Sequence, residues 1–311
     1  MEHGMIARPA VPHQAPVPAP PVLERWRLVS DSLSDTATQM AVDQLLAEAV
    51  WHGHSPPTLR LYRWPVPGVT VGRHQPEGTL PCPAVRRLTG GHAVFHDREL
   101  TFSLAVPAGH RLLAGGPRAA YRAVAAACEQ ALATLGLRVG GGNPDAPQRP
   151  ARVFSCFTGA TREETAVDGH KLVAIAQRHT RMGLLTQGSI PLSAPARLPG
   201  AARSGALGLD RLVPEVTWER LADAVKIAFS ACMNARLDAL PLTPEERRKA
   251  RHMACKYYTP LPGPFQGAPR TSRMAEKTPK EAPHLTEKWT EGPREGQTAP
   301  KLEGGHSGRI P

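Results

Sequence analysis

Paired cysteines, aromatic residues and long apolar runs are all scarce in this sequence of 311 residues. The five cysteines are Cys82, Cys128, Cys156, Cys232 and Cys255. Because none belongs to a C-x-x-C pair, the sequence argues against a disulfide framework or a structural zinc site, and we expect free thiols. Aromatic residues make up only 5%, and no recognition helix or zinc finger is evident, so no nucleic-acid partner is expected. No run approaches the roughly 20 apolar residues of a membrane helix, so no membrane partner is expected either.

Proline is abundant, and its 33 copies are enriched towards the two ends of the chain. Residues 1–22 contain no basic segment followed by an apolar one, so we expect a disordered, proline-rich arm rather than a signal peptide. Residues 259–311 are rich in Pro, Gly, Lys and Glu and have few large apolar residues, which predicts a disordered tail. These features favour a soluble protein of the cytoplasm.

The formal net charge is +11. A surplus of this size favours an acidic partner, such as a nucleic acid, a membrane surface or an acidic protein. A generic basic surface explains it equally well, because net charge bears on association rather than on fold. Charge alone therefore does not choose among these partners.

Between the two ends, hydrophobic periodicity predicts a single domain over residues 23–258. A short strand is expected at 25–29. It is followed by a helix that Ser34 or Asp35 caps. The apolar residues at helical spacing in this helix are Met40, Ala41, Leu45 and Ala49. We interpret them as ordinary core residues.

The rest of the domain continues to alternate between strands and helices. Residues 58–78 suit a hairpin turned at 65–68, and residues 99–107 suit a half-buried strand. The other elements expected are helices at 116–137, 217–237 and 242–258 and strands at 171–179 and 188–192. Pro117 suits the first turn of the 116–137 helix, and Gly136 suits its C-cap. Strands mixed with flanking helices predict an α+β fold with mixed or antiparallel sheets.

The stretch RRLTGGHAVFHDRELTFS at residues 86–103 carries the first candidate site. Its T-G-G run at 89–91 can form a tight turn whose backbone approaches a ligand without a Cβ in the way. Arg86 and Arg87 can donate hydrogen bonds to a phosphate or a carboxylate. The alternative is a plain Gly-Gly hairpin turn with solvated arginines.

The same stretch contains two histidines that could contact a substrate or a metal ion. His96 can act as a switchable hydrogen-bond donor, because its ordinary pKa lies close to neutral pH. His92 and His96 do not predict a metal site, since an i, i+4 pair shares one face only in a helix and no third ligand is evident.

Further blocks downstream complete a pattern that resembles the lipoate/biotin A/B protein ligase superfamily. The matching blocks are MAVD at 40–43, VTVGRHQ at 69–75, the stretch at 86–103, Cys156-Phe157, G-x-K ending at Lys171, AQR at 176–178 and QGSI at 187–190. The resemblance covers residues 23–258 and implies a single biotin/lipoate-ligase-like catalytic domain. It is closest to the cysteine-dependent octanoyltransferases. ATP-using lipoate ligases carry an Asn-containing pattern where this chain has HDRELTFS, and here Cys156 precedes Lys171 by the expected fifteen positions.

The resemblance implies that Cys156 is the nucleophile and Lys171 the second catalytic residue. A thiolate suits the reaction because it exchanges one thioester for another at little energetic cost. A neighbouring ammonium would stabilise the negative charge that develops. The substrate-binding residues implied are Arg87, Thr89, Gly90, Gly91, His96, Gln177, Gly188 and Ser189.

The resemblance also implies the partners. The donor would be octanoyl-acyl carrier protein, and the acceptor would be a lipoyl domain or the glycine cleavage H protein. No cofactor is implied, and ATP with Mg²⁺ would be needed only by a ligase. A basic enzyme suits an acidic carrier protein.

Four residues depart from the family's usual pattern, and they are His92, Ala174, His179 and Gln187. Ala174 stands where Gly is common, so its Cβ limits close backbone approach. Gln187 stands where His is common, which removes a titrating group. Three alternatives therefore stay open beside an octanoyl-carrier transferase: an amidotransferase that takes its acyl group from an octanoylated protein, an ATP-dependent lipoate-protein ligase, and a catalytically degenerate protein that binds carrier or lipoyl domains.

Overall fold

The structure is a computed structural model that describes residues 22–32, 35–76, 80, 82–141, 155–157, 165–167, 170–201 and 205–261. All of them belong to one compact unit, Met1–Ala268, and the second unit, Pro269–Pro311, lies outside the described residues. The expected arm at 1–22 and tail at 259–311 fall almost wholly outside them as well. Leu261, inside the expected tail, is paired with Ala84 in an isolated bridge.

A six-stranded mixed sheet forms the centre of the domain. Its strands are β1 (Glu24–Asp31), β2 (Thr58–Tyr62), β6 (Glu99–Pro107), β10 (Ala174–Thr180), β11 (Gly183–Pro191) and β12 (Ala235–Ala239). They lie in the order β10-β11-β6-β2-β1-β12. β1 runs parallel to both β2 and β12, and the other neighbours are antiparallel. The α+β prediction with mixed sheets is confirmed.

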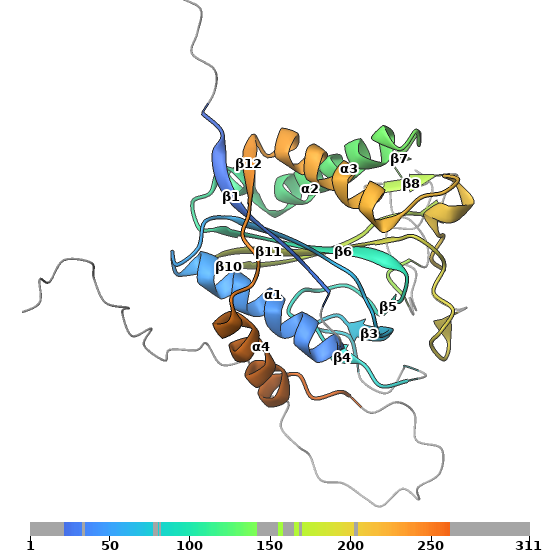
Figure 1. Cartoon of the computed structure of the whole chain (residues 1–311), viewed down its shortest axis with the longest axis horizontal. Helices are drawn as coiled ribbons and strands as arrows, with labels where there is room; N and C mark the ends of the chain where they lie inside the picture. Colours follow the sequence, from blue (N-terminus) through green and yellow to red (C-terminus); the bar gives the residue numbers. More distant parts are fainter. Residues whose placement is uncertain are drawn as a thin grey trace, which may run out of the picture. The chain divides into compact units, whose positions relative to one another are not determined.

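Helices cover both faces of this sheet (Figure 1). The described residues form the α-helices α1 (Thr36–Trp51), α2 (Gly116–Thr134), α3 (Trp218–Cys232) and α4 (Pro244–Tyr257) and the short 3-10 helices η1 (Arg111–Leu113) and η3 (Leu209–Arg211). α1 and α4 pack together below the sheet in Figure 1, and α2 and α3 pack together above it. No helix in the described part of the chain combines the length and the apolarity needed to cross a membrane.

Two small three-stranded sheets complete the described structure. Their strands are β3 (Gly68–Val71), β4 (Val85–Arg86), β5 (Val94–His96), β7 (Gly140–Gly141), β8 (Thr165–Val167) and β9 (His170–Lys171). The first sheet has the order β4-β3-β5 and the second the order β7-β8-β9. The first sheet positions the candidate site, because β4 and β5 flank the T-G-G run at residues 89–91.

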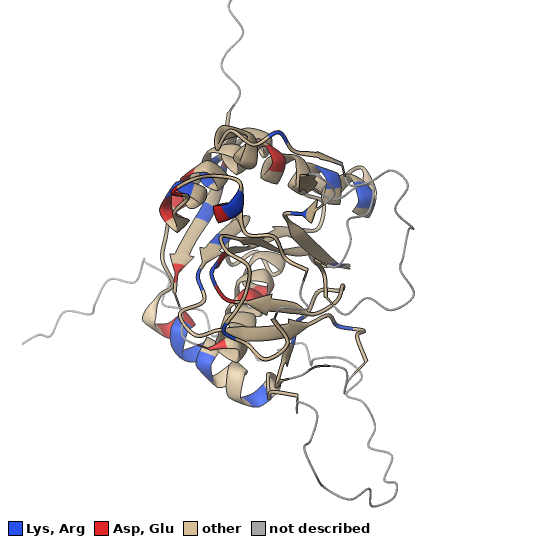
Figure 2. Ribbon diagram, turned by 90° about the vertical axis from the view of Figure 1, so that its right-hand side faces the viewer, with Lys and Arg blue, Asp and Glu red and all other residues tan. Residues whose placement is uncertain are grey.

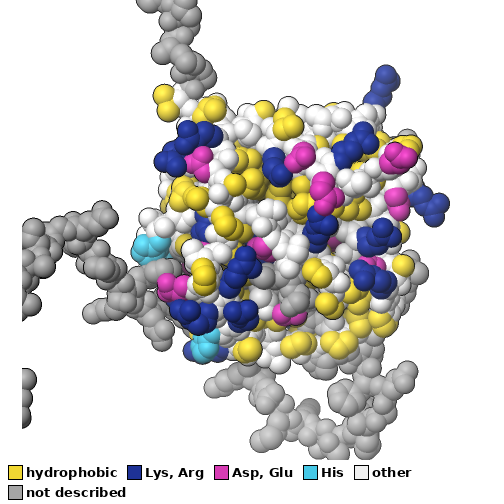
Figure 3. Space-filling model, viewed as in Figure 1, with side chains coloured by type: hydrophobic (Ala, Val, Ile, Leu, Met, Phe, Trp, Pro, Cys, Tyr) yellow, Lys and Arg dark blue, Asp and Glu magenta, His cyan; other side chains and the backbone are white. Residues whose placement is uncertain are grey.

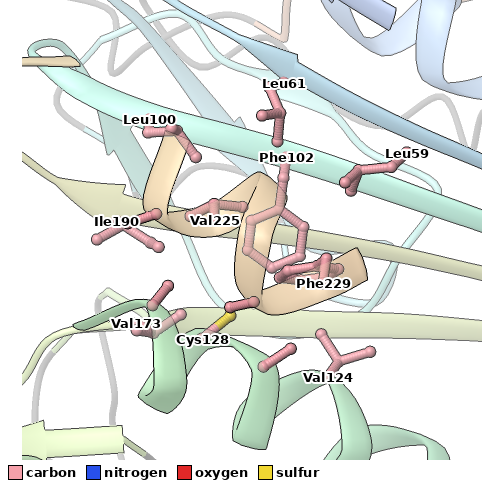
Figure 4. Close-up of a cluster of buried hydrophobic side chains, with 14 of the residues drawn as sticks. Leu59, Leu61, Leu100, Phe102, Val124, Cys128, Val173, Ile190, Val225 and Phe229 are labelled. Carbon is pink, nitrogen blue, oxygen red and sulfur yellow. The ribbon is translucent and has the colours of Figure 1, made fainter. Parts of the chain in front are cut away.

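The main hydrophobic core lies between the large sheet and the layer of α2 and α3 (Figure 4). Phe102 from β6 meets Phe229 from α3 edge to face, with ring centroids 5.3 Å apart. Gly188 of β11 is the cross-strand partner of Phe102, and a Cβ added at Gly188 would come within 2.1 Å of the Phe102 ring. Glycine is therefore required at position 188 by core packing, because a rigid ring cannot give way by that much.

A second, polar core lies on the other face of the sheet, between the sheet and α1. Asp35 caps α1 through its Oδ1, which accepts from the backbone N of Thr38 at 2.8 Å. The helix is buried on almost every side, polar residues included, because it lies between the sheet and α4. Arg60 of β2 is fully buried and donates to Asp31 at 2.8 Å and to Asp43 of α1 at 2.7 Å. The expected helix and its Asp35 cap are thus confirmed, but its buried surface is not confined to one apolar face.

The hairpin expected over residues 58–78 is wrong. β2 lies inside the large sheet between β1 and β6, whereas β3 belongs to the small sheet with β4 and β5. The chain crosses from one sheet to the other around Trp64, whose indole Nε1 donates to Thr101 of β6 at 2.7 Å. Alternation showed two strands correctly but could not show which neighbours they pair with.

Three other predicted elements have different extents or surroundings. β6 is buried on both faces rather than on one, because helices cover each side of the sheet. The strand expected at 171–179 is divided between β9 and β10, so Lys171 and the later residues lie in different sheets. The helix expected at 217–237 ends at Cys232, and a β-strand follows it. Asn234, with a φ of 42°, makes the turn into that strand.

The helix at 116–137 follows its prediction more closely. Pro117 lies in the first turn of α2. The cap at the C-terminal end is Leu135, and Gly136 follows with a φ of 87°, the left-handed conformation that glycine adopts without strain. The helix expected at 242–258 is α4, which begins with a capping box between Thr243 and Glu246.

Lys and Arg residues are spread over several elements of the domain, with acidic residues among them (Figure 2). The face shown in Figure 3 has the same mixture. The positive charge is therefore not gathered in one stripe on that face. The net charge by itself does not indicate where an acidic partner would bind.

Candidate active site

The thiol of Cys156 is held against the backbone of the turn that follows residues 89–91. The strand bridge between Ser155 and Ala93 positions it, and the backbone N of Cys156 donates to the carbonyl of Ala93 at 2.9 Å. The backbone N of His92 lies 3.1 Å from Sγ, and Sγ lies 3.1 Å from the carbonyl of His92. One backbone donor and one backbone acceptor therefore face the sulfur.

Arg87 brings a buried positive charge to the same sulfur. Its Nη2 lies 3.8 Å from Sγ of Cys156 and donates to the carbonyls of Gly90 at 2.6 Å and His92 at 2.8 Å. Burial lowers the pKa of the Arg87 guanidinium, and the nearby Cys156 opposes this by favouring the charged form. Arg87 thus fastens the turn around the thiol and places a cation beside it.

Gly91 is the position at which this turn tolerates no side chain. Its φ is 86°, and an added Cβ would lie 2.9 Å from Arg87 Nη2 and 3.2 Å from Cys156 Sγ. The neighbouring loop approaches as closely, since a Cβ on Gly72 would lie 1.9 Å from the carbonyl oxygen of Gly91. Gly91 therefore serves close approach, and the sulfur is one of the groups approached, whereas a Cβ on Gly90 would meet no atom within 4 Å.

A chain of hydrogen bonds extends from Arg87 to a buried carboxylate. Arg87 Nη1 lies 3.3 Å from Thr70 Oγ1, which lies 2.7 Å from Nε2 of His96. The other ring nitrogen of His96 lies 2.7 Å from Glu99. The imidazole is also stacked on Trp64, with ring centroids 3.9 Å apart. His96 is therefore held in place on both nitrogens and on one ring face.

Gln187 links the turn at residues 89–91 to the polar core between the sheet and α1. Its amide nitrogen donates to Asp43 Oδ2 at 2.7 Å, and its amide oxygen accepts from the hydroxyl of Thr89 at 2.7 Å. Asp43 also accepts from Tyr62 and Ser103. A glutamine satisfies both neighbours at every pH, because its amide is a donor and an acceptor at once and does not titrate.

The variant Gln187→Glu is expected to be stable in acid and unstable at higher pH. When protonated, the new carboxyl can still donate to Asp43 and accept from Thr89. When ionised, it opposes the Asp43 carboxylate in a buried site, so its folded-state pKa rises above the ordinary 4.3 or so. Below about pH 4.3 the deficit should vanish. As the pH rises through the raised pKa it should grow to about 3 kcal/mol, which corresponds to a shift of about two pKa units.

Urea titrations of this variant at several pH values give the measurement. The matched control is Gln130→Glu, because Gln130 lies on the exposed side of α2. That change should leave the midpoint nearly independent of pH relative to the wild type. A deficit of equal size at pH 5 and pH 8 in Gln187→Glu would contradict the proposed electrostatic cause.

A narrow cavity of about 30 Å³, here called the thiol cavity, opens beside Sγ. It is lined by Met40, Tyr62, Thr70, Arg87, Val94, His96, Thr101, Cys156, Ala174, Ile175, Ala176, Gln187, Gly188 and Ser189. The hydroxyl of Ser189 is buried here and has no hydrogen-bond partner in the described part of the chain. An unsatisfied buried hydroxyl that faces a cavity can donate to a ligand.

The residues predicted for the site do not all line the same cavity. Cys156, Arg87, His96, Gly188 and Ser189 line the thiol cavity. Gly90 and Gln177 line a second, larger cavity, described below. Thr89 and Gly91 belong to the turn between β4 and β5. Lys171 is buried in β9 and is not among the residues that line either cavity. Every one of these roles remains a prediction.

Sequence reasoning missed the residues that hold the site in place. Thr70, Trp64 and Glu99 fix His96, and Asp43 holds Gln187. Asp43 and Thr70 lie in two of the blocks that carried the resemblance, so their place in those blocks was the available signal. Arg86, considered as an anion donor, instead donates to three backbone carbonyls of the loop at 72–75.

The departures from the family's pattern can now be placed. His92 is exposed, and its backbone N and carbonyl contact the thiol, so these two contacts do not depend on the identity of its side chain. The Cβ of Ala174 lies in a small apolar cluster with Val94 and Phe157. No group of three or more His, Cys, Asp or Glu residues suited to a metal ion occurs in the described ranges.

Comparison with known proteins agrees with this architecture. The fold is that of a lipoate-protein ligase: a solved lipoate-protein ligase A bound with ATP superposes with a TM-score of 0.59 at 20% identity, covering 75% of this chain and 95% of that one. The protein Ta0514 from T. acidophilum, solved with bound lipoic acid, superposes with a TM-score of 0.61 at 20% identity and the same coverage. Residues 35–198 match the lipoyl protein ligase A/B catalytic domain, and the chain belongs to this family.

Two relatives show the similarity over nearly their full length. Octanoyltransferase LipM of Kyrpidia tusciae is 33% identical over 265 residues, which cover 76% of this chain and 97% of that protein. Octanoyltransferase LipM of Oceanobacillus iheyensis is 30% identical over 265 residues, which cover 76% of this chain and 95% of that protein. The expected superfamily is confirmed.

Proposed function

We propose that this protein transfers an octanoyl group from a carrier-bound thioester to a lysine of a lipoyl domain, through a thioester on Cys156. The observation that carries the proposal is the position of Sγ, between the backbone N of His92 and the guanidinium of Arg87 at the thiol cavity. The names of the two relatives support octanoyl as the group transferred. The acceptor would be a lipoyl domain or a glycine cleavage H protein.

The reaction proceeds in two steps, acylation of Cys156 and transfer of the acyl group to the acceptor lysine. The thiolate of Cys156 attacks the carbonyl carbon of the donor thioester, the carbon–sulfur bond to the carrier breaks, and the carrier leaves as a thiol after taking up a proton. The acceptor lysine, as a free amine, then attacks the acyl-enzyme. An amide forms, a proton is lost from nitrogen, and the cysteine is released. Since a thioester drives amide formation, neither ATP nor a metal ion is needed.

Negative charge appears first on sulfur and then on the carbonyl oxygen, and the site offers groups for both. We assign to Arg87 the stabilisation of the negative charge on sulfur. Its guanidinium lies 3.8 Å from Sγ and is buried, so water screens their attraction little. The backbone N of His92 is a donor available to the oxygen, and so is the hydroxyl of Ser189, which has no partner among the described residues. The role of Lys171 rests on the resemblance, and its burial in β9 is compatible with a fixed position.

The acyl chain needs more room than the thiol cavity offers as it stands. An eight-carbon chain exceeds about 30 Å³, so side chains must move when it binds. Met40 and Ile175 line the cavity and can change rotamer without breaking a buried ion pair. Octanoyl would then lie against apolar surface, with its carbonyl left near Sγ.

The test is intact mass of the wild-type protein after incubation with octanoyl-acyl carrier protein in the absence of ATP. An adduct of about 126 Da that disappears when a lipoyl domain is added, and reappears on that domain, is the expected result. Octanoylated glycine cleavage H protein as the better donor would instead indicate an amidotransferase. Modification of the lipoyl domain only with ATP and free lipoate would identify a ligase, and no reaction with any of these would leave a binding protein.

A further inference from the structure

A second cavity, here called the basic cavity, is lined in part by Gly90 of the turn at residues 89–91. Its volume is about 360 Å³, and it is lined by Arg73, His74, Leu88, Gly90, Gln177, Arg178, His179 and Thr180. Two of these residues are arginines and two are histidines, and none is Asp or Glu. A cavity with this lining attracts an anion. The proposed acyl transfer at Cys156 leaves it without a role.

Arg73 is a cation of the basic cavity whose side chain has no partner among the described residues. Its backbone N donates to the carbonyl of Thr89 at 2.9 Å, which ties it to the T-G-G turn. Its guanidinium makes no hydrogen bond or ion pair within the described ranges, although the residue is half-buried. A guanidinium partly removed from water and left unpaired gains most from a ligand with several oxygen acceptors.

The Arg86 guanidinium holds the loop that carries Arg73 in place. Arg86 donates to the carbonyls of Gly72 at 2.9 Å, Arg73 at 3.2 Å and Gln75 at 2.8 Å. Three bonds from one guanidinium fix the direction in which the loop presents its side chains. Binding an anion there therefore costs little ordering of the backbone.

The second half of β10, Gln177 to Thr180, forms another part of the lining. His179 Nε2 lies 3.0 Å from Gln177 Oε1, and burial lowers the pKa of His179. At neutral pH the imidazole is therefore a neutral hydrogen-bonding group, and the positive charge of the basic cavity comes from Arg73 and Arg178. Arginine carries its charge at any working pH.

The basic cavity and the thiol cavity are neighbours along the same structural elements. Ala174–Ala176 of β10 line the thiol cavity, and the next four residues line the basic cavity. Because a strand rises about 3.3 Å per residue, Ala176 and Thr180 are about 13 Å apart. Gly90, in the wall of the basic cavity, accepts from the same Arg87 that lies beside Sγ. A ligand that reacts at Sγ and extends along β10 places its far end among the cations.

We propose that the basic cavity binds the phosphodiester of the phosphopantetheine arm that presents the acyl thioester to Cys156. This inference rests on the proposed function and names the part of the donor that the protein recognises. The arm is a long flexible chain with a sulfur at one end and a phosphate at the other, which matches a thiol and an arginine separated along one strand. A guanidinium binds two phosphate oxygens through a planar fork, and a phosphodiester keeps its charge at every working pH.

The test compares two donors that differ only in the phosphate, octanoyl-phosphopantetheine and octanoyl-pantetheine. The rate constant for adduct formation is measured by intact mass for the wild type and for Arg73→Gln. We expect the wild type to react faster with the phosphorylated donor by about tenfold, the effect of one good charge-assisted contact. Arg73→Gln should lose most of this advantage, react normally with octanoyl-pantetheine, and pass its octanoyl group to a lipoyl domain at the wild-type rate.

A matched arginine controls for the loss of positive charge in general. Arg220 is exposed on α3 and lies outside both cavities, so Arg220→Gln should keep the tenfold preference. Raising the salt concentration should erode the preference in the wild type, because the contact is ionic. Equal loss with both donors in Arg73→Gln would overturn the proposal. So would a defect confined to transfer onto the lipoyl domain, which would indicate an acidic acceptor surface in this cavity.

Direct binding separates this inference from the proposed chemistry. If the wild type forms no adduct with any thioester, the acyl-transfer proposal fails, yet calorimetric titration with phosphopantetheine and with pantetheine still tests the cavity. Tighter binding of the phosphorylated compound that is lost in Arg73→Gln would support the phosphate site by itself. Equal affinities for the two compounds would overturn it.

Discussion

The variant Arg60→Met is expected to lower the free energy of unfolding by about 3–5 kcal/mol, the usual cost of removing one partner from a buried ion pair. Arg60 is fully buried in β2 and donates to Asp31, to Asp43 and to the carbonyl of Gln39. Methionine retains much of the side chain's volume. The loss therefore arises from two buried carboxylates left without their cation rather than from an empty cavity.

The charge on Arg60 is secure in the folded protein. Burial alone would lower the pKa of its guanidinium, but the carboxylates of Asp43 and Asp31 outweigh burial and raise it above its usual value. The cluster is therefore a permanent structural feature and not a switch. It also reaches the candidate site, because Asp43 binds the Gln187 amide that holds Thr89.

Denaturant titration followed by circular dichroism measures the change. Arg25→Met is the matched control, since Arg25 lies on the neighbouring strand β1 and pairs with Asp238 at an exposed position. Exposed pairs contribute little, so that variant should unfold close to the wild-type midpoint. Adding Asp43→Asn to Arg60→Met should restore part of the loss by removing one unpaired charge. Equal midpoints for Arg60→Met and Arg25→Met would contradict a structural role for the buried cluster.

The parts of the fold that sequence could predict are those governed by local signals. Asp35 at the start of α1 and Gly136 after α2 act through their own hydrogen bonds or backbone conformation, so their positions could be read directly. Hydrophobic period also identified strands of the large sheet, among them β1, β2 and β6. None of these signals depends on which distant segment packs against the element.

Errors arose where distant segments decide the outcome. Thr101 and Ser103 look like the solvent face of an alternating strand, yet they bind Trp64 and Asp43 in a buried polar layer. Alternation reports polarity and not exposure, and a second layer of helices turns a polar face into an interior one. The hairpin error has the same origin, because β2 gains partners from β1 and β6, which come from distant parts of the chain.

The candidate site was predictable in its residues and less so in its geometry. The resemblance named Cys156 and Arg87, and the structure brings the two together across 69 positions of sequence. The resemblance also named Lys171 as the second catalytic residue. Lys171 is buried in β9 and its role stays a prediction, while the guanidinium that lies beside Sγ belongs to Arg87.

The variant Cys156→Ala is expected to abolish the octanoyl adduct and to reduce octanoyl transfer by about 10³-fold or more, the scale of loss when a covalent nucleophile is removed. Three of the protein's four other thiols cannot readily take its place. Burial, which is only partial at Cys232, raises the pKa of Cys82, Cys128 and Cys232, and this keeps them protonated and poorly nucleophilic. Intact mass and transfer of octanoyl to a lipoyl domain provide the two measurements.

Cys232→Ala is the matched control, because Cys232 is an exposed thiol at the end of α3, outside both cavities. This variant should form the adduct at the wild-type rate. An adduct that persists in Cys156→Ala would contradict the proposed nucleophile and would direct attention to another thiol. Circular dichroism of both variants shows whether loss of activity reflects chemistry or unfolding.

Cys156→Ser separates a nucleophile from a binding residue. A serine hydroxyl can keep contact with the backbone of His92, so binding of the carrier should persist, but it is a far weaker nucleophile than a thiolate at neutral pH. Loss of the adduct with unchanged carrier affinity is the result expected of an enzyme. If instead the wild type and Cys156→Ser bind the carrier equally and neither forms an adduct, the protein is a binding module that retains the architecture of its family.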